Sequence, residues 1–442
     1  MNLPHPFVIR TREILGEEFD ALIAALQQTP PTSIRSNDKI EYIPSENQVD
    51  WCSSGYYLQE RPLFTADPLF HAGAYYVQEA SSMFLCAIAE QYLTNVEKML
   101  DLCAAPGGKS TLLLQHLSTK SLLVSNEIVS SRANILAENI IKWGNPNVLV
   151  TNNEPHEFKN LSGYFDAMLI DAPCSGEGMF RKDPNAISEW SENNVKMCAE
   201  RQRQILQDVW EALKTDGILI YSTCTFNRLE NEENVKWICE ELGAKLLPVK
   251  IDNYQGIVIS DVGYRFYPHK IKGEGLFIAV LQKTTGISHF QKSKIDTKKI
   301  ISVKSDIIHP FLLNEKNQGY YIDDKNGISA FDKSFEKDVL ILQNRLKVIY
   351  SGIFCGEMKG KDFIPSPALA LSKVLNHESC EIVDVDYQTA IRFLRNETLN
   401  LPEYKRGFLL IIHNKIALGW VKNVGNRSNN LYPKNWKIRM KI

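Results

Sequence analysis

Short apolar runs and helically spaced apolar residues alternate along the middle of the chain. The run at 165–170 is almost continuously apolar, which is typical of a strand covered on both faces. The repeated strand–helix order predicts an α/β fold with a doubly wound, mainly parallel sheet. Strands are predicted at 99–103, 122–126, 148–150, 165–170, 217–221, 264–269 and 276–281, and helices at 108–117, 131–143, 195–213 and 230–242.

The flanking segments do not continue this repeat. Apolar residues at helical spacing over 11–28 are followed by two prolines and by short predicted strands at 33–37 and 40–43. Residues 75–93 have the spacing of a helix. Over 404–442, apolar and polar residues alternate between glycine and asparagine turns, which predicts a small β-rich module.

These patterns divide the chain into four parts. A small N-terminal α/β unit covers 1–70, and the strand–helix repeat forms a domain over 71–285. A linker and middle domain cover 286–385, and the β-rich module covers 386–442. Because parallel sheets of this kind bind ligands at the carboxyl ends of their strands, we expect the functional residues there.

Charge is distributed unevenly between these parts. The chain of 442 residues has a formal net charge of −2, yet residues 284–442 contain 25 basic and 16 acidic residues. Residues 404–442 contain nine basic residues and no acidic one. A basic module on an acidic body predicts a polyanionic partner, and a solvated basic face without a partner is the alternative.

Cysteine usage and hydropathy exclude several classes of protein. The nine cysteines form no CxxC pair and have no regular spacing, so neither a disulfide framework nor a zinc site is expected. The sequence shows no signal-peptide pattern and no apolar run of roughly 18 residues, the length that a membrane span needs. We therefore expect a cytoplasmic protein with free thiols, no metal and no membrane association.

The segment Asp101–Lys109 is a candidate ligand-binding turn. It follows a predicted strand, reads Asp-Leu-Cys-Ala-Ala-Pro-Gly-Gly-Lys and precedes a predicted helix. Gly107 and Gly108 allow close backbone approach, and the helix N-terminus offers free N–H groups to an anionic ligand. The pattern is neither GxGxxG nor GxxxxGK[ST], which weakens a dinucleotide or P-loop interpretation.

Acidic residues follow the next three predicted strands. Glu127 ends the second strand, where a carboxylate can accept hydrogen bonds from both ribose hydroxyls. Glu154 follows the third strand, close to where an adenine amino group would lie, and Asp171 follows the fourth. Each residue alone could be an ordinary surface or turn residue. Behind a glycine-rich turn, the ribose role is favoured for Glu127.

Two cysteines, Cys174 and Cys224, follow the fourth and fifth predicted strands. Free cysteine is most often a buried small hydrophobe, and a redox pair is also consistent with this placement. Two thiols beside a cofactor turn also fit covalent catalysis on a pyrimidine. A thiolate would add to carbon 6, carbon 5 would be methylated, and a second thiol would assist release. The sequence alone does not rank the two thiols.

Several motifs resemble those of Sun-type RNA cytosine-C5 methyltransferases, and most closely their bacterial RsmF-like branch, which acts on 16S ribosomal RNA. The C-terminal segments Leu418-Gly419-Trp420 and Val424-Gly425-Asn426-Arg427 resemble the PUA-like RNA-binding module of that branch. The matching catalytic motifs are Gln78–Met83, Cys103–Lys109, Asp171–Gly178 and Tyr221–Thr225.

The resemblance implies a Rossmann-like methyltransferase fold and S-adenosylmethionine as cofactor. Glu127 would bind the ribose, and Asp171 would lie between the cofactor and the target base. Cys224 would be the nucleophile, and Cys174 would help in product release. The family usually carries Asp after the third strand, where this chain has Glu154. The cofactor would be held by Cys103, Ala104, Ala105, Pro106, Gly107, Gly108 and Lys109.

RNA is the implied partner, either as free 16S ribosomal RNA or within the assembling 30S subunit. The alternatives are a non-catalytic RNA-binding ribosome-assembly factor and the same chemistry on transfer RNA. An exocyclic-amine methyltransferase is disfavoured because Asp171–Cys174 lacks a second proline and an aromatic residue. A nicotinamide oxidoreductase is disfavoured by the absence of GxGxxG. The expected phosphate contacts are Arg35, Arg181, Lys182 and Arg427.

Overall fold

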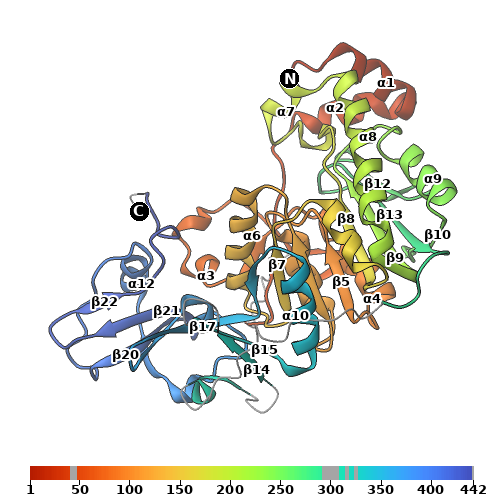
Figure 1. Cartoon of the computed structure of the whole chain (residues 1–442). Coiled ribbons are helices and arrows are strands. Elements are labelled where there is room, and N and C mark those ends of the chain that lie inside the picture. Colours follow the sequence, from red (N-terminus) through yellow and green to blue (C-terminus); the bar gives the residue numbers. More distant parts are fainter. Residues whose placement is uncertain (40–46, 291–307, 314–317, 323–326, 441–442) are drawn as a thin grey trace.

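The computed structural model describes residues 1–39, 47–290, 308–313, 318–322 and 327–440 (Figure 1). Within these ranges the chain forms one large central sheet and three four-stranded sheets. The strand predicted at 40–43 and residues 291–307, 314–317 and 323–326 of the predicted linker and middle domain lie outside the described residues. In the part of the chain that is described, no helix has the length and apolar character needed to cross a membrane.

The central sheet has ten strands in the order β11-β12-β13-β9-β8-β5-β6-β7-β16, with β10 beside β13. Its middle is parallel, as the strand–helix repeat predicts, and its edges are antiparallel. The parallel strands are β5 (Lys98–Asp101), β6 (Leu122–Asn126), β7 (Val148–Thr151), β8 (Phe165–Asp171) and β9 (Leu213–Thr223). The antiparallel strands are β10 (Ala244–Leu246), β11 (Val258–Ile259), β12 (Tyr264–Phe266), β13 (Leu276–Lys283) and β16 (Val348–Ser351).

The strand order reverses at β5. The chain proceeds from β5 to β6 and β7 on one side, then returns to β8 and β9 on the other side. Connections that leave two neighbouring strands in opposite directions open a crevice at the carboxyl ends of those strands. The connections after β5 and β8 border this crevice, and they carry the predicted cofactor turn and Asp171–Cys174.

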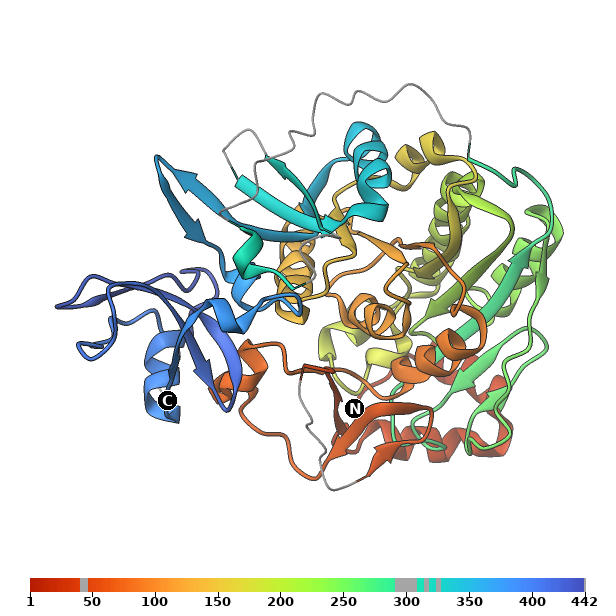
Figure 2. The same ribbon diagram turned by 90° about the horizontal axis from the view of Figure 1, so that it is seen from below.

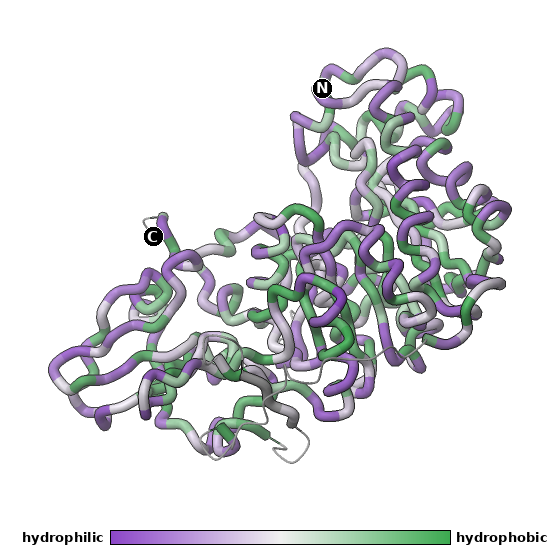
Figure 3. Tube along the Cα trace, viewed as in Figure 1, coloured by the Kyte–Doolittle hydropathy of each residue, from purple (hydrophilic) through white to green (hydrophobic). Residues whose placement is uncertain are grey.

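Helices cover both faces of the central sheet. One face packs against α4 (Leu85–Tyr92), α5 (Gly108–His116) and α6 (Ser130–Trp143), and the other against α8 (Glu192–Val209), α9 (Glu232–Glu241) and α10 (Glu336–Arg345). Successive strand residues alternate between these two cores, so that Met99 packs with the first set of helices and Leu100 with the second. Figure 3 shows hydrophobic positions concentrated along the central strands.

The N-terminal unit differs in detail from the prediction. The single helix predicted over 11–28 is two helices, because Gly16 adopts a left-handed φ of +58° between them. Residues 75–77 form a strand rather than the start of a helix, so the N-terminal sheet extends past residue 70. The elements are α1 (His5–Leu15), α2 (Phe19–Leu26), β1 (Thr32–Ser36), β2 (Gln48–Val49), β3 (Cys52–Leu58), α3 (Pro68–His71) and β4 (Tyr75–Val77).

The middle segment joins two sheets. It forms a small sheet of its own, and it also adds β16 to the edge of the central sheet and α10 to its second core. The small sheet contains β14 (Gln318–Ile322), β15 (Gly327–Asp332), β17 (Ile353–Lys359) and β18 (Asp362–Pro365), followed by α11 (Pro367–Ala370). The C-terminal module contains β19 (Glu381–Asp384), α12 (Tyr387–Leu394), β20 (Gly407–His413), β21 (Ile416–Asn423) and β22 (Ser428–Asn430).

The two ends of the sequence share one hydrophobic core. Phe64 and Tyr75 of the N-terminal segment are buried together with Phe393 and Leu418 of the C-terminal module. Figure 2 shows this N-terminal segment in orange-red beside the blue C-terminal module. The β-rich module is therefore fixed to the body of the molecule by apolar contact.

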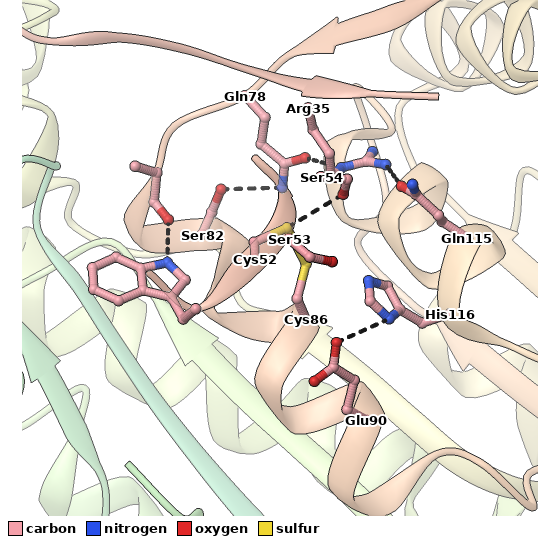
Figure 4. The surroundings of a disulfide bond; sticks show 12 residues. Arg35, Cys52, Ser53, Ser54, Gln78, Ser82, Cys86, Glu90, Gln115 and His116 are labelled. Carbon is pink, nitrogen blue, oxygen red and sulfur yellow. Dashed lines mark hydrogen bonds and ion pairs between the residues drawn. A yellow bond between two sulfur atoms is a disulfide. The ribbon is translucent and has the colours of Figure 1, made fainter. Parts of the chain in front are cut away.

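One pair of cysteines corrects the expectation that all thiols are free. Cys52 of β3 and Cys86 of α4 form a disulfide, with 5.4 Å between their Cα atoms (Figure 4). The other seven cysteines are free. The two partners are 34 residues apart and belong to different elements, so nothing in their spacing indicated the pair.

Candidate active site

The predicted cofactor turn connects β5 to α5. Gly107 has a φ of +114°, and the Ala105–Pro106 peptide bond is cis. The turn is tied to the neighbouring strand because the Ala104 N–H donates to the Asn126 carbonyl at 2.8 Å. A Cβ atom on Gly108 would lie 3.3 Å from the Tyr76 ring, so the turn leaves little space for a side chain there. The free N–H groups at the start of α5 lie beside the crevice.

Lys109 and Asp171 join the cofactor turn to the end of β8. Lys109 Nζ donates to Asp171 Oδ2 at 2.7 Å, and Ser222 Oγ donates to Asp171 Oδ1 at 2.7 Å. Burial lowers the pKa of Lys109, but the Asp171 carboxylate outweighs burial, and the net pKa is above the ordinary value. Lys109 therefore stays charged at neutral pH and fixes the carboxylate in the crevice.

The two predicted thiols are in direct contact. Cys174 Sγ lies 3.0 Å from Cys224 Sγ, and the Cys224 N–H donates to Cys174 Sγ at 3.3 Å. The hydrogen bond with Cys224, followed by burial, raises the pKa of Cys174 well above its ordinary value. Cys174 is therefore a neutral thiol at neutral pH, and its S–H can donate a hydrogen bond to Cys224 Sγ.

Buried polar residues that the sequence did not single out surround the two thiol loops. Glu177 is fully buried, and it accepts hydrogen bonds from Trp190 Nε1 at 2.9 Å and from the Phe226 N–H at 3.0 Å. Its carboxylate also pairs with Arg10 of α1. Glu230 is equally buried beside Cys174. Glu177 lies within the motif Asp171–Gly178, and the signal for Glu230 is a mostly polar run at 227–234, which is also typical of an exposed helix start.

Glu127 and Glu154 occupy different environments. Glu127 is 2% exposed at the end of β6, where Oε1 accepts from the Val129 N–H at 2.9 Å. Glu154 is exposed and caps the short 3-10 helix Pro155–Leu161. Its neighbour Asn153 is buried, and its Oδ1 accepts from the Lys347 N–H at 3.0 Å. The cofactor contacts of Glu127 and Glu154 stay predictions.

Two of the four residues predicted to contact phosphate are buried. Arg35 is fully buried between the N-terminal sheet and α5, where its guanidinium donates to Gln78 and Gln115 (Figure 4). The Arg181 side chain is 4% exposed and is paired with Glu274 at 2.9 Å. Nothing local in the sequence marks either arginine as buried, because their partners come from distant segments.

Lys182 and Arg427 remain accessible. The Lys182 side chain is 30% exposed, with Nζ 3.7 Å from the Glu274 carboxylate. Arg427 is exposed in the turn before β22. Their contacts with RNA stay predictions. Among the described residues, no group of three or more His, Cys, Asp or Glu side chains is placed to hold a metal ion.

The parallel sheet, its switch point and the flanking helices define a Rossmann-like methyltransferase. A methyltransferase homolog protein from Pyrococcus horikoshii has the same fold, with a TM-score of 0.55 and 26% identity, covering 63% of this chain and 94% of that chain. Sequence models of three families match the chain: 16S rRNA methyltransferase RsmB/F at 91–282, the N-terminal domain of 16S rRNA methyltransferase RsmF at 3–80, and the methyltransferase RsmF PUA domain at 380–438.

Full-length relatives place the chain more narrowly. Ribosomal RNA small subunit methyltransferase F of Escherichia fergusonii is 30% identical over 98% of this chain and 96% of its own length. The protein of the same name from Aliivibrio salmonicida is 28% identical over 98% of this chain and 97% of its own length. The chain therefore belongs to the ribosomal RNA small subunit methyltransferase F family.

Proposed function

We propose that this enzyme methylates carbon 5 of a cytidine in 16S ribosomal RNA, with S-adenosylmethionine as methyl donor. Cys224 forms a covalent bond to carbon 6 of the base, and Cys174 assists release. The observation that carries the proposal is the 3.0 Å contact between the two thiols, beside the Lys109–Asp171 pair at the carboxyl ends of the parallel strands. The relatives are named for small-subunit ribosomal RNA, which supports the substrate.

The crevice fits the proposed donor. Gly107 and Gly108 leave the turn without side chains, and α5 begins there with free N–H groups. In this proposal the Glu127 carboxylate, which follows β6, binds the ribose hydroxyls. Asp101 Oδ1 is buried without a hydrogen-bond partner among the described residues. When bound, the donor supplies a methyl group on a positively charged sulfur, which leaves as a neutral thioether.

Cys224 makes carbon 5 reactive. Carbon 5 of cytosine is a weak nucleophile, but a thiolate that adds to carbon 6 forms a C–S bond and moves the C5=C6 electron pair toward carbon 5 and the ring nitrogens. The Asp171 carboxylate, held by Lys109 and Ser222, takes the proton that Cys224 loses and gives it to N3 while this charge develops. The proton returns to Asp171 when carbon 5 takes the methyl group, and it goes back to Cys224 when that sulfur leaves carbon 6.

Cys174 acts after methyl transfer. Cys224 itself is the largest cause of the raised pKa of Cys174, so bonding of Cys224 to carbon 6 removes that cause. Cys174 can then lose its proton to solvent and take the proton from carbon 5. The C5–H electron pair re-forms the C5=C6 bond, the C6–S bond breaks, and Cys224 leaves as a thiolate. Cys174 ends the step as a thiol.

The proposal is tested by measuring 5-methylcytidine in 16S ribosomal RNA from cells that lack the gene. Wild type should restore one or more modified cytidines, and Cys224→Ala should restore none. With substrate RNA in vitro, Cys174→Ala should accumulate a denaturant-stable covalent complex. Cys239→Ala, which removes a free thiol of α9 outside the site, is the control and should behave as wild type. Full methylation by Cys224→Ala would refute the assignment of Cys224 as the nucleophile. If 16S ribosomal RNA from cells with the wild-type gene contains no such 5-methylcytidine, a non-catalytic assembly factor or a transfer RNA substrate would be favoured.

A further inference from the structure

Two neighbouring residues, Glu230 and Asn231, lie between the thiol loops just before α9. Neither side chain is exposed to solvent. Each bonds to one thiol loop on the residues that flank the cysteine, and neither bonds to a sulfur atom. Because a loop with free ends would let its thiol move, bonds on both sides of a cysteine restrict where its sulfur can lie.

The Cys174 loop is held by Glu230 and its partner Gln202. The Ser175 N–H donates to Glu230 Oε2 at 3.0 Å, and the Ser175 hydroxyl donates to Glu230 Oε1. On the other side of Cys174, Gln202 Nε2 donates to the Pro173 carbonyl at 2.9 Å and to Glu230 Oε2 at 2.8 Å. The flanks of Cys174 are thus joined through one buried carboxylate and one buried amide.

Asn231 holds both flanks of Cys224 in the same manner, and the Thr225 hydroxyl also lies 3.0 Å from the Ser175 hydroxyl of the other loop. The Thr223 hydroxyl donates to Asn231 Oδ1 at 2.5 Å, and Asn231 Nδ2 donates to the Thr225 carbonyl at 3.0 Å. One amide side chain therefore bridges the residues before and after Cys224. Thr223, Thr225 and Asn231 are all buried, so water does not compete for these bonds.

We propose that Glu230 is the positioning residue for Cys174 and Asn231 the positioning residue for Cys224. This inference rests on the proposed roles of the two thiols. The inference predicts that two adjacent residues affect different steps of the reaction. Loss of Glu230 should leave addition of Cys224 to carbon 6 intact and slow the removal of the carbon-5 proton with cleavage of the C6–S bond. Loss of Asn231 should slow the addition itself.

The test uses the full chain, a cytidine-containing 16S ribosomal RNA fragment and S-adenosylmethionine. Glu230→Gln should accumulate the denaturant-stable RNA complex about 10- to 100-fold above wild type, as Cys174→Ala does, because misplacement of a reacting group by about 1 Å costs that much rate. Asn231→Ala should form neither product nor complex at the wild-type rate. In the Cys174→Ala background, Asn231→Ala should lower the rate of trapping, whereas Glu230→Gln should leave it unchanged.

Glu232→Gln is the matched control. Glu232 begins α9 one residue later, is buried, and pairs with Arg265 rather than with either thiol loop. Glu232→Gln should lower the melting temperature without trapping RNA, so general destabilisation is distinguished from a displaced thiol. Melting temperature and cofactor binding are measured for every variant. If Glu230→Gln or Asn231→Ala fails to fold, Ser175→Ala removes the hydroxyl bond to Glu230 and Thr223→Val removes the hydroxyl bond to Asn231. These variants carry the same expectations in direction.

The outcomes separate this inference from the proposed function. If Cys174→Ala traps no RNA, the proposed division of labour between the thiols is wrong. If Cys174→Ala traps RNA but Glu230→Gln releases product as wild type does, the positioning role of Glu230 is wrong. Trapping by Asn231→Ala at the level of Glu230→Gln would overturn the separation by step, because both residues would then act on release.

Discussion

Asp101, the last residue of β5, has a buried carboxylate of which only one oxygen accepts a hydrogen bond. Oδ2 accepts from Ser110 Oγ at 2.6 Å, and Oδ1 has no partner among the described residues. Burial raises the pKa of Asp101 from 3.8 to about 7, although the Ser110 hydrogen bond opposes the shift. The folded protein therefore binds this proton more tightly than the unfolded chain does.

Stability should consequently depend on pH through Asp101. The stabilisation from protonated Asp101 is complete below about pH 4 and is lost as the pH rises to about 7. Asp101→Asn cannot titrate, so relative to wild type it should gain up to roughly 4 kcal/mol between pH 4 and pH 8, about 1.4 kcal/mol per pKa unit. Urea unfolding at both pH values measures the difference. The exposed Asp252→Asn is the control, and parallel profiles for wild type and Asp101→Asn would contradict the assignment.

At the scale of elements, the local sequence pattern predicts the parallel core of the sheet. The elements that were not predicted depend on pairing with strands far away in the sequence. β6 has the predicted bounds, and α5 and α6 differ from prediction by one residue at one end. The strand 75–77 was not predicted because three residues are too few for a period, and its partner β1 lies some 40 residues earlier. β16 pairs with β7 across the sequence, which no local pattern indicates.

The candidate site divides in the same way. The carboxyl ends of parallel strands meet at one edge, so the sequence could place Lys109, Asp171 and the two thiols together. The residues that hold the thiol loops could not be found, because Glu230 and Asn231 lie in a polar run whose burial depends on α8 and β9. The burial of Arg35 could not be predicted for the same reason, since its partners come from other elements.

The position of α1 provides a test at this scale. Arg10 of α1 pairs with the buried Glu177 between the thiol loops and lies 5.2 Å from the Trp190 ring. Figure 1 shows α1, α2 and α7 (Pro184–Glu189) together at one end of the central sheet. Arg10→Ala should destabilise the fold by about 3 kcal/mol, because it leaves a buried carboxylate unpaired.

The same helix supplies the control for this prediction. Arg12 pairs with Asp20 across an exposed surface, so Arg12→Ala should change the free energy of unfolding by less than about 1 kcal/mol. Chemical denaturation measures both variants. Equal losses for Arg10→Ala and Arg12→Ala would mean that the Glu177 contact does not anchor α1.

Across the whole molecule, an acidic body carries a basic C-terminal module. Arg427, Lys437 and Arg439 are exposed on that module. Lys437 and Arg439 line one hollow together with Arg395 and its partner Glu397. Removing the module would uncover the core it shares with Phe64 and Tyr75, so point substitutions are the better probe of its charge.

Replacing Arg427, Lys437 and Arg439 by alanine should weaken RNA binding and reduce the slope of log affinity against log salt by about 2, at roughly 0.7 per lost contact to single-stranded RNA. Cofactor binding and melting temperature should not change. The control removes three exposed lysines from the acidic body, Lys120, Lys245 and Lys250. An unchanged slope for the first variant, or an equal reduction for the control, would exclude the module's cations as the RNA contact.

The core shared by the two ends of the sequence also constrains synthesis. Residues 34–77 leave the ribosome early, but Leu418 and Tyr432, which cover their apolar face, are made near the end of the chain. At about 5–20 residues per second, roughly 20–70 s pass between the synthesis of that face and the synthesis of the residues that bury it. During this interval Phe64 and Tyr75 of the nascent chain are exposed to solvent and to chaperones. A truncated transcript therefore yields an aggregation-prone intermediate rather than a shorter active enzyme.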